Sequence, residues 1–254
     1  MLPNLILSGG PGRHPYATTS PRLAWLLSLE GFTSDITEDI EAGLTRLAAG
    51  AYELLTVNAL RWRMDGADLD GSRRPDRGDA PRPPGYAGER DRWAFSLSPE
   101  GRAAVLAHVE RGGGVLAIHA APICFDDWPE WGDIVGAHWV WGTSDHPPLG
   151  LASVTVHTGA HEIVDGVGDF EVVDEVYSHL DVRPDVKPLA TSHHDGADHP
   201  LLWARQYAPP SGEGPGARVV YDALGHDERS FDHPVHRAII RRAARWLRGE
   251  PCDP

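Results

Sequence analysis

"RGGGVLAIHAAP" (residues 111–122) is the stretch that decides the fold. Three glycines lead into the short apolar run Val115–Ile118, which stops at His119 and continues with two alanines and a proline. A short apolar run between glycine and proline is typical of a buried strand. Because a strand that ends on a histidine delivers that side chain to the edge of a sheet, we expect His119 to lie in a functional site. The local sequence also allows the alternative of a hydrogen-bonded histidine in the core.

The first half of the chain alternates expected strands with expected helices. Ser20 and Pro21 favour a helix that begins with Ser20 as its N-cap and ends at Gly31. Ser98 and Pro99 begin another helix in the same way. Repeated strand–helix–strand units with short connections predict a parallel sheet that is covered by helices on both faces. The other expected elements here are strands at 5–8, 32–36, 53–57 and 115–119 and a helix at 39–49.

The second half is richer in strand patterns, and it ends in a helix at 234–247 before Gly249. We find no internal repeat and no clear linker, so we expect one α/β domain over residues 1–254 with three layers and a mostly parallel central sheet. Residues 61–93 are rich in Arg, Asp, Gly and Pro and predict a long polar surface excursion, either a partly mobile loop or a lid. The expected strands are 152–156, 170–173, 186–190, 201–206 and 218–222.

Composition excludes several classes of partner. The formal net charge is −14, from 37 acidic and 23 basic residues, whereas a nucleic-acid-binding protein would present a basic face. The arginines of the last helix are best explained as its solvated side. No apolar run approaches the roughly 20 residues of a membrane span, and the N-terminus carries no secretion signal. With only two cysteines, these features indicate a cytoplasmic protein; a homo-oligomer is allowed.

Several polar residues follow the predicted strands. The carboxyl ends of parallel strands meet at one edge of a sheet, where ligands bind in this class of fold, so we expect these side chains to converge. Each has an ordinary explanation as well: a core histidine, a turn, a cap or a loop residue. The residues at these strand ends are His14, His119, Asp174 and Glu175, and Gly225, His226 and Asp227.

Standard catalytic motifs are absent from the sequence. "GGPGRH" (9–14) lacks the Lys-Ser/Thr of a P-loop, and "HEIVD" (161–165) is not the HExxH of a zinc peptidase. No Gly-x-Ser-x-Gly elbow is present. The histidines His193, His194 and His199 in "SHHDGADHP" could bind a metal, but a polar surface loop explains them better.

The stretch "GGGVLAIHAA" (112–121) resembles the class I glutamine amidotransferase-like fold, which has a flavodoxin-like arrangement. In that fold a strand presents a cysteine nucleophile at a tight turn into a helix. This chain has His119 at that position, and Cys124 lies five residues beyond the turn. Because a glutaminase needs a thiolate, we do not expect that activity.

Over nearly its whole length the chain is similar to the ThuA-like family, named for trehalose utilisation. The sequence departs from the family at His161-Glu162-Ile163, where the family often has His-Pro-Ile, and it has a longer Gly/Pro loop before residue 218. The resemblance implies a role in the metabolism of trehalose or 3-keto-glycosides. The segments that carry it are "SGGPGRHP" (8–15), "GGGVLAIHAA" (112–121), "IVGAHWVWGTSDHPP" (134–148), "FEVVDEVY" (170–177), "LLWARQY" (201–207), "RVVYDALGHD" (218–227) and "AIIRRAARWLRGE" (238–250).

A keto-sugar substrate suggests a mechanism. Such a sugar carries an acidic proton beside its carbonyl, so its reaction needs a base and a group that stabilises the enediolate. Histidine can be the base, and a divalent cation, Zn²⁺ or Mn²⁺, could be held by His14, His119, His226 and Glu175. Trp139 is a further candidate for stacking on a sugar. The expected catalytic residues are His119, His226, Glu175 and Asp174, and the expected substrate-binding residues are His14, Trp141, His146, Tyr177, Trp203 and Asp227.

The sequence allows two other functions. The chain could be a non-catalytic, sugar-binding relative of the amidotransferase-like fold. It could also be a hydrolase of an amide or ester, although it lacks a serine or cysteine at the turn.

Overall fold

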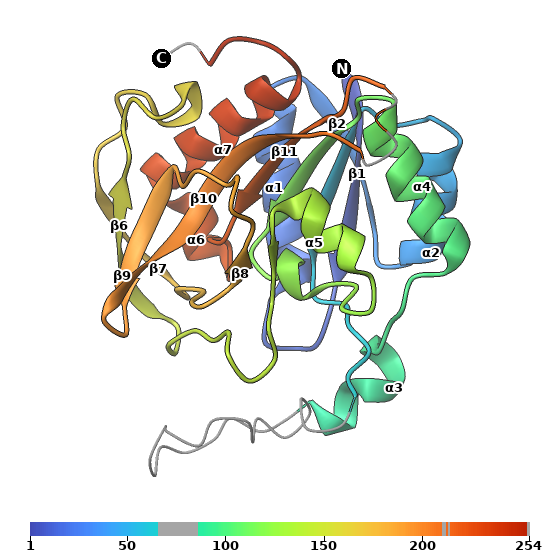
Figure 1. Cartoon of the computed structure of the whole chain (residues 1–254), viewed down its shortest axis with the longest axis horizontal. Helices are drawn as coiled ribbons and strands as arrows, with labels where there is room; N and C mark the ends of the chain where they lie inside the picture. The colour runs from blue at the N-terminus through green and yellow to red at the C-terminus, as the bar shows by residue number, and fades with distance from the viewer. Residues whose placement is uncertain (66–85, 210–211, 213, 253–254) are drawn as a thin grey trace.

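The computed structural model describes residues 1–65, 86–209, 212 and 214–252. Its centre is a nine-stranded sheet with the order β2-β1-β3-β4-β11-β10-β9-β6-β7 (Figure 1). A small two-stranded sheet pairs β5 (Ala137–His138) with β8 (Asp181–Val182). The strands of the large sheet are β1 (Leu2–Gly9), β2 (Phe32–Thr37), β3 (Leu54–Ala59), β4 (Gly114–Ile118), β6 (Gly150–Val156), β7 (Phe170–Asp174), β9 (Ala190–His194), β10 (Ala197–Tyr207) and β11 (Ala217–Asp222).

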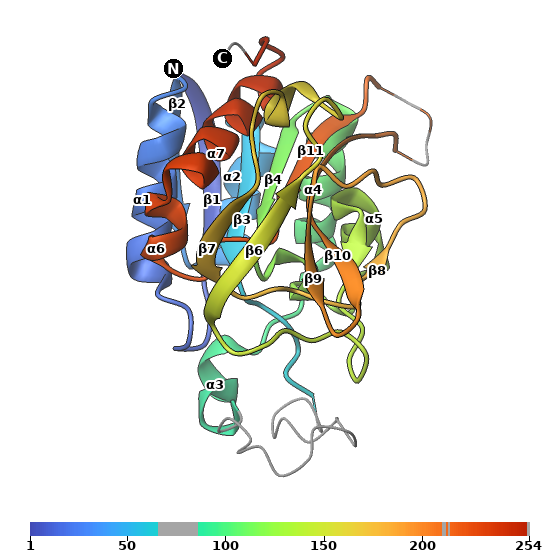
Figure 2. The ribbon, with the colours of Figure 1, turned by 90° about the vertical axis from the view of Figure 1, so that its left-hand side faces the viewer.

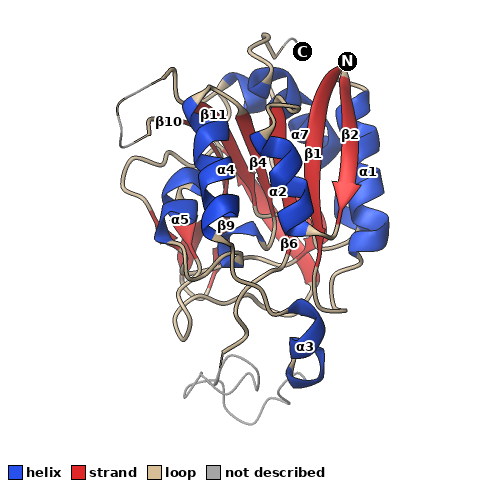
Figure 3. Cartoon of the chain, turned by 90° about the vertical axis from the view of Figure 1, so that its right-hand side faces the viewer, coloured by secondary structure: helices blue, strands red, loops and turns tan. Residues whose placement is uncertain are grey.

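Helices cover both faces of this sheet, as Figures 2 and 3 show from opposite sides. One face carries α1 (Tyr16–Ser28), α6 (Glu228–Asp232) and α7 (Pro234–Leu247). The other carries α2 (Ile40–Ala48), α4 (Pro99–Glu110) and α5 (Pro129–Val135). None of the described helices has both the length and the apolar character needed to cross a bilayer. The remaining helical segments are α3 (Arg90–Trp93) and the 3₁₀ turns Ala87–Glu89, Ala121–Ile123 and Glu162–Val164.

The sheet is mixed, and only part of it is parallel. Strands β2, β1, β3, β4 and β11 pair in parallel, whereas β10, β9, β6 and β7 pair antiparallel with their neighbours. The expectation of a mostly parallel sheet therefore holds for these five strands, of which β11 comes from the C-terminal half. Strands β6, β7, β9 and β10 differ because they follow one another without crossover helices, and a direct turn can join only antiparallel strands.

The segment "SHHDGADHP" is a hairpin and not the expected surface loop. Asp195 and Gly196 have φ angles of +49° and +77°, which suits the two-residue turn between β9 and β10. Strand β9 also begins at Ala190, where the expected strand at 186–190 ends. The polar residues on the exposed face of this hairpin hid the strand pattern in the sequence.

The start of α1 also differs from the prediction. The helix begins at Tyr16, so Pro21 lies inside it and Ser20 is not its cap. The Ser20 hydroxyl is buried instead, 2.7 Å from the Ser8 hydroxyl, and it accepts a hydrogen bond from the Asn58 amide at 3.0 Å. These contacts with β1 and β3 give the serine a partner in the core, and they replace the capping role.

The described ends of the 61–93 excursion are packed into the protein, contrary to a purely surface segment. Trp62, Met64 and Trp93 are buried. The guanidinium groups of Arg61 and Arg92 both contact the Trp93 ring, with their carbons 4.4 and 4.3 Å from its centroid. Residues 66–85 lie outside the described residues, so the choice between loop and lid stays open.

The glycines before β4 make room for a buried histidine of α4. A Cβ on Gly113 would lie 2.2 Å from the His108 ring. The Nε2 atom of His108 donates to the Gly114 carbonyl at 2.8 Å, and its Nδ1 atom accepts from Arg111 at 2.9 Å. Burial lowers the pKa of His108 from 6.5 to about 4. The folded protein therefore keeps this ring neutral at a pH where the unfolded chain protonates it.

We expect the free energy of unfolding to fall as the pH drops from 6.5 towards 4, because only the unfolded chain then takes up a proton at His108. This residue alone should account for a loss of about 3 kcal/mol. Urea unfolding of the wild type and His108→Gln at several pH values isolates the effect, since glutamine does not titrate. The variant should lose less stability over this range, and equal pH slopes for the two proteins would contradict the assignment.

Candidate functional site

His119 stands at a sharp turn between β4 and the 3₁₀ turn Ala121–Ile123. Its φ angle of +51° lies in the left-handed region, which costs a non-glycine residue of order 1–3 kcal/mol. Strand β11 holds the turn in place. The His119 amide donates to the Asp222 carbonyl at 2.7 Å, and the Tyr221 hydroxyl donates to the His119 carbonyl at 3.0 Å. The turn expected at this position is therefore present and supported.

The hydrogen bond of its ring fixes how His119 faces the site. Nδ1 donates to the Ala223 carbonyl at 2.7 Å, which leaves the Nε2 lone pair directed elsewhere. Nε2 lies 3.4 Å from Oε2 of Glu175, and only 2% of the His119 side chain is exposed. His119 is buried, but it belongs to a polar cluster and not to an apolar core.

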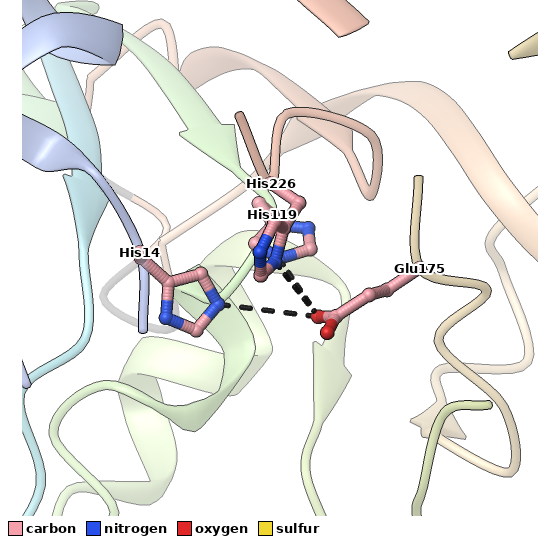
Figure 4. A group of neighbouring side chains, drawn as sticks. All are labelled: His14, His119, Glu175 and His226. Carbon is pink, nitrogen blue, oxygen red and sulfur yellow. Dashed lines mark ion pairs between the residues drawn. The ribbon is translucent and has the colours of Figure 1, made fainter. Parts of the chain in front are cut away.

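Four of the expected residues converge at the carboxyl edge of the parallel strands (Figure 4). His14 comes from the loop after β1, His119 follows β4, Glu175 follows β7, and His226 follows β11. Oε2 of Glu175 is the common neighbour, 3.1 Å from Nδ1 of His226 and 4.0 Å from Nε2 of His14. One nitrogen or oxygen atom from each of the four lies within 4.8 Å of the others. We call these residues the His/Glu cluster: His14, His119, Glu175 and His226.

Asp174 is not one of these four residues, although its Oδ1 atom lies 3.9 Å from Nδ1 of His119. Its carboxylate accepts hydrogen bonds from the backbone amides of Glu175 at 2.8 Å, Gly225 at 2.7 Å and His226 at 3.3 Å. The side chain is fully buried. Asp174 thus ties the end of β7 to the loop after β11 and holds two members of the cluster in place. The structure gives it a positioning task, whereas the sequence placed it among the catalytic residues.

His146 is the accessible histidine of the site. Its Nδ1 atom donates to the Pro147 carbonyl at 2.9 Å and lies 3.4 Å from Oε1 of Glu175. Its ring stacks on that of Tyr177, with centroids 5.3 Å apart. The His146 side chain is 35% exposed, compared with 10% or less for each member of the cluster. A molecule that approaches from solvent can reach His146 first.

The cluster concentrates charge in a buried place. Burial alone would raise the pKa of Glu175, but the facing rings of His119 and His226 lower it well below its usual range. For His14, burial and the neighbouring histidines both lower the pKa well below 6.5. For His119, burial opposes protonation, but Glu175 and Asp174 outweigh it and raise the pKa. A single ionised carboxylate therefore faces several histidines.

Aromatic rings extend outward from the cluster. Tyr177 contacts the ring of His119 with centroids 4.6 Å apart, and Trp139 contacts Tyr177 at 5.4 Å. The Trp141 ring contacts that of Trp139 with centroids 6.0 Å apart, and the Trp62 ring contacts that of Trp141 at 5.9 Å. The expected residues Trp141 and Tyr177 are in this row. Trp62 was missed because it lies in the polar 61–93 stretch, where only its aromatic character could have indicated a buried position.

Two expected substrate-binding residues have structural contacts of their own, Trp203 in the core and Asp227 directly after His226. Trp203 is fully buried, packs on Tyr221 and donates from Nε1 to the Val135 carbonyl at 2.8 Å. Asp227 caps α6 by accepting from the Arg229 amide at 2.9 Å, and it also forms an ion pair with Arg229. Both residues belong to segments that carry the family resemblance. In the structure, Trp203 packs in the core and Asp227 caps a helix.

Solved structures share this fold. A ThuA-like protein from Parabacteroides merdae has a TM-score of 0.71 at 18% identity, over 100% of this chain and 92% of its own. A ThuA-like protein from Bacteroides uniformis gives 0.60 at 15% identity, over 99% and 94%. A Salmonella typhimurium protein described as cytoplasmic gives 0.58 at 12% identity, over 97% and 99%. These similarities define an α/β protein of the ThuA-like fold.

The family itself follows from the sequence match. Residues 93–247 match the family model ThuA, described as trehalose utilisation. The match spans more than half of the chain, so the protein belongs to the ThuA family. The family supports a carbohydrate-related role. No curated protein matches the sequence.

We expect Asp174→Asn to lower the free energy of unfolding by about 1–3 kcal/mol and Asp174→Ala to lower it by more, because backbone amides lose their acceptor in a buried place. The asparagine amide would also face the Gly225 N–H group. Urea unfolding measures both losses. Asp198→Asn is the matched control, since that side chain is 71% exposed and its change should stay within about 0.5 kcal/mol. Unchanged stability of both Asp174 variants would contradict the positioning role.

Proposed function

We propose that this protein is an enzyme of carbohydrate metabolism that acts on a keto-sugar, such as a 3-keto-glycoside, by removing the proton beside its carbonyl. Membership of the ThuA family supports the carbohydrate-related part. The observation that carries the chemistry is the buried His/Glu cluster with an accessible histidine, His146, at its side. We also infer from the turn at His119 that the fold is related to the class I glutamine amidotransferases.

His146 is the best candidate for the base. Because its Nδ1 donates to the Pro147 carbonyl, Nε2 is the basic nitrogen of the neutral ring. The substrate C–H proton transfers to this atom, and the electrons of the bond move onto the carbonyl oxygen to give an enediolate. His119 was the base expected from the sequence, but only 2% of its side chain is exposed. A buried group of this kind suits a supporting role better than direct removal of a substrate proton.

The negative charge of the enediolate needs a positive partner. The cluster lies beside His146, because Oε1 of Glu175, one of its members, is 3.4 Å from Nδ1 of His146. A positive charge held there would act in a buried place, where electrostatic stabilisation is strong. Trp139 and Trp141, which are only partly buried, offer aromatic faces for the sugar ring next to these polar groups.

The amide or ester hydrolase is less well supported. Cys124 is buried, and its Sγ donates to the Ala59 carbonyl. Burial raises the pKa of this thiol to about 12, so it is not a thiolate at neutral pH. A glutaminase mechanism therefore has no nucleophile at the turn or beside it.

Exchange of the substrate proton with deuterated solvent tests the proposal directly. We expect the protein to incorporate deuterium beside the carbonyl of a 3-keto-glycoside, as mass spectrometry or NMR can show. His146→Gln should slow this exchange by at least about 100-fold without lowering Tm. His193→Gln is the matched control, because that histidine is exposed and its ion pair is with the equally exposed Asp198; it should exchange at the wild-type rate.

The outcomes separate the candidate functions. Exchange at an equal rate in His146→Gln would remove His146 from the mechanism. Saturable binding of the glycoside by calorimetry, with neither exchange nor product, would instead support the sugar-binding alternative that the aromatic row also favours. Turnover of an amide or ester panel would favour the hydrolase.

A further inference from the structure

The geometry points to a binding site for one divalent transition-metal cation of the Zn²⁺ type at the His/Glu cluster. We propose that Nε2 of His14, Nε2 of His119, Nδ1 of His226 and Oε2 of Glu175 are its ligands. This inference stands on the cluster alone and does not depend on which sugar, if any, the protein converts.

The spacing of the four atoms fits a tetrahedral ion. Metal–ligand bonds of roughly 2.0–2.1 Å at tetrahedral angles place neighbouring ligand atoms about 3.3 Å apart. Oε2 of Glu175 is 3.1 Å from His226, 3.4 Å from His119 and 4.0 Å from His14. The distances to His226 and His119 are already close to this value, whereas His14 would have to approach Glu175 by about 0.7 Å. The four atoms lie within 4.8 Å of one another, so an ion would draw the widest pair together by up to about 1.5 Å, which rotation of the side chains can supply.

The same atoms lack hydrogen bonds. Among the described residues, Oε2 of Glu175, Nε2 of His119, Nδ1 of His226 and both ring nitrogens of His14 are buried without a hydrogen-bond partner. The short approaches to Glu175 therefore do not have the direction of hydrogen bonds. Buried polar atoms are nearly always satisfied, and a cation at the centre of the four would satisfy them together.

Surrounding groups orient the ligands as the neighbours of metal ligands do. Nδ1 of His119 donates to the Ala223 carbonyl at 2.7 Å, so Nε2 carries the lone pair. Oε1 of Glu175 faces Nδ1 of His146 at 3.4 Å, which leaves Oε2 for the ion. Asp174 holds the backbone amides of Glu175 and His226. His119, Glu175 and His226 are thus each held in position by a neighbour outside the cluster.

The donor set selects the class of metal. Three imidazole nitrogens and one carboxylate oxygen suit Zn²⁺ and similar ions, whereas Mg²⁺ and Ca²⁺ prefer oxygen ligands. Mn²⁺ also favours more oxygen than this cluster offers. The competing explanation is a buried group of histidines around one ionised carboxylate, without any metal.

Metal titration of the untagged full-length protein distinguishes the two explanations. After treatment with a chelator, we expect the protein to bind one Zn²⁺ per chain in competition with a chromogenic chelator and to gain Tm. Mg²⁺ and Ca²⁺ should do neither. Glu175→Gln and His226→Gln should weaken Zn²⁺ binding by at least about 100-fold, since loss of a group that merely supports a ligand already costs 10–100-fold. His193→Gln should bind Zn²⁺ like the wild type.

Circular dichroism and Tm of the metal-free variants show whether they fold, so a loss of binding in folded Glu175→Gln supports the site. Zn²⁺ binding that survives in both cluster variants would overturn the inference. So would a folded wild type that binds no Zn²⁺, or one that binds Mg²⁺ equally well. Zn²⁺ binding without deuterium exchange would keep the metal site and overturn only the proposed reaction.

Discussion

The backbone of His119, held in the left-handed region, is the constraint on which the site depends. It is stable there because β4 lies in parallel register with β11, so that the Asp222 carbonyl, the Ala223 carbonyl and the Tyr221 hydroxyl all reach the residue. The sheet thus supports the strained turn, and the turn aims Nε2 at the cluster.

The other members of the cluster reach this point through a second constraint, the Asp174 carboxylate. Strand β7 lies at the far edge of the nine-stranded sheet from β2, but Asp174 joins its end to the loop that carries His226. Through this connection Glu175, which follows an antiparallel-paired strand, lies beside histidines that follow parallel strands.

Much of this arrangement could be predicted from the sequence, since local patterns encode it. The strand before His119 and the expected convergence of His14, His119, Glu175 and His226 are confirmed as positions in the fold. The prediction failed where tertiary contacts decide. Ser20 looks like a cap but bonds across to β1 and β3, Asp227 caps a helix, and Trp203 fills the core. Nothing local distinguishes such a tryptophan from Trp139 beside the cluster.

The different exposure of its residues explains the two roles proposed for the site. The buried cluster suits a cation, and the accessible His146 suits proton transfer, with aromatic rings beside both. The most direct measurement is an X-ray anomalous difference map, recorded above the zinc absorption edge, from crystals of the protein loaded with Zn²⁺. The account predicts one peak within bonding distance of His14, His119, His226 and Glu175. A map with no peak among these side chains, or with zinc bound only elsewhere on the protein, would contradict it.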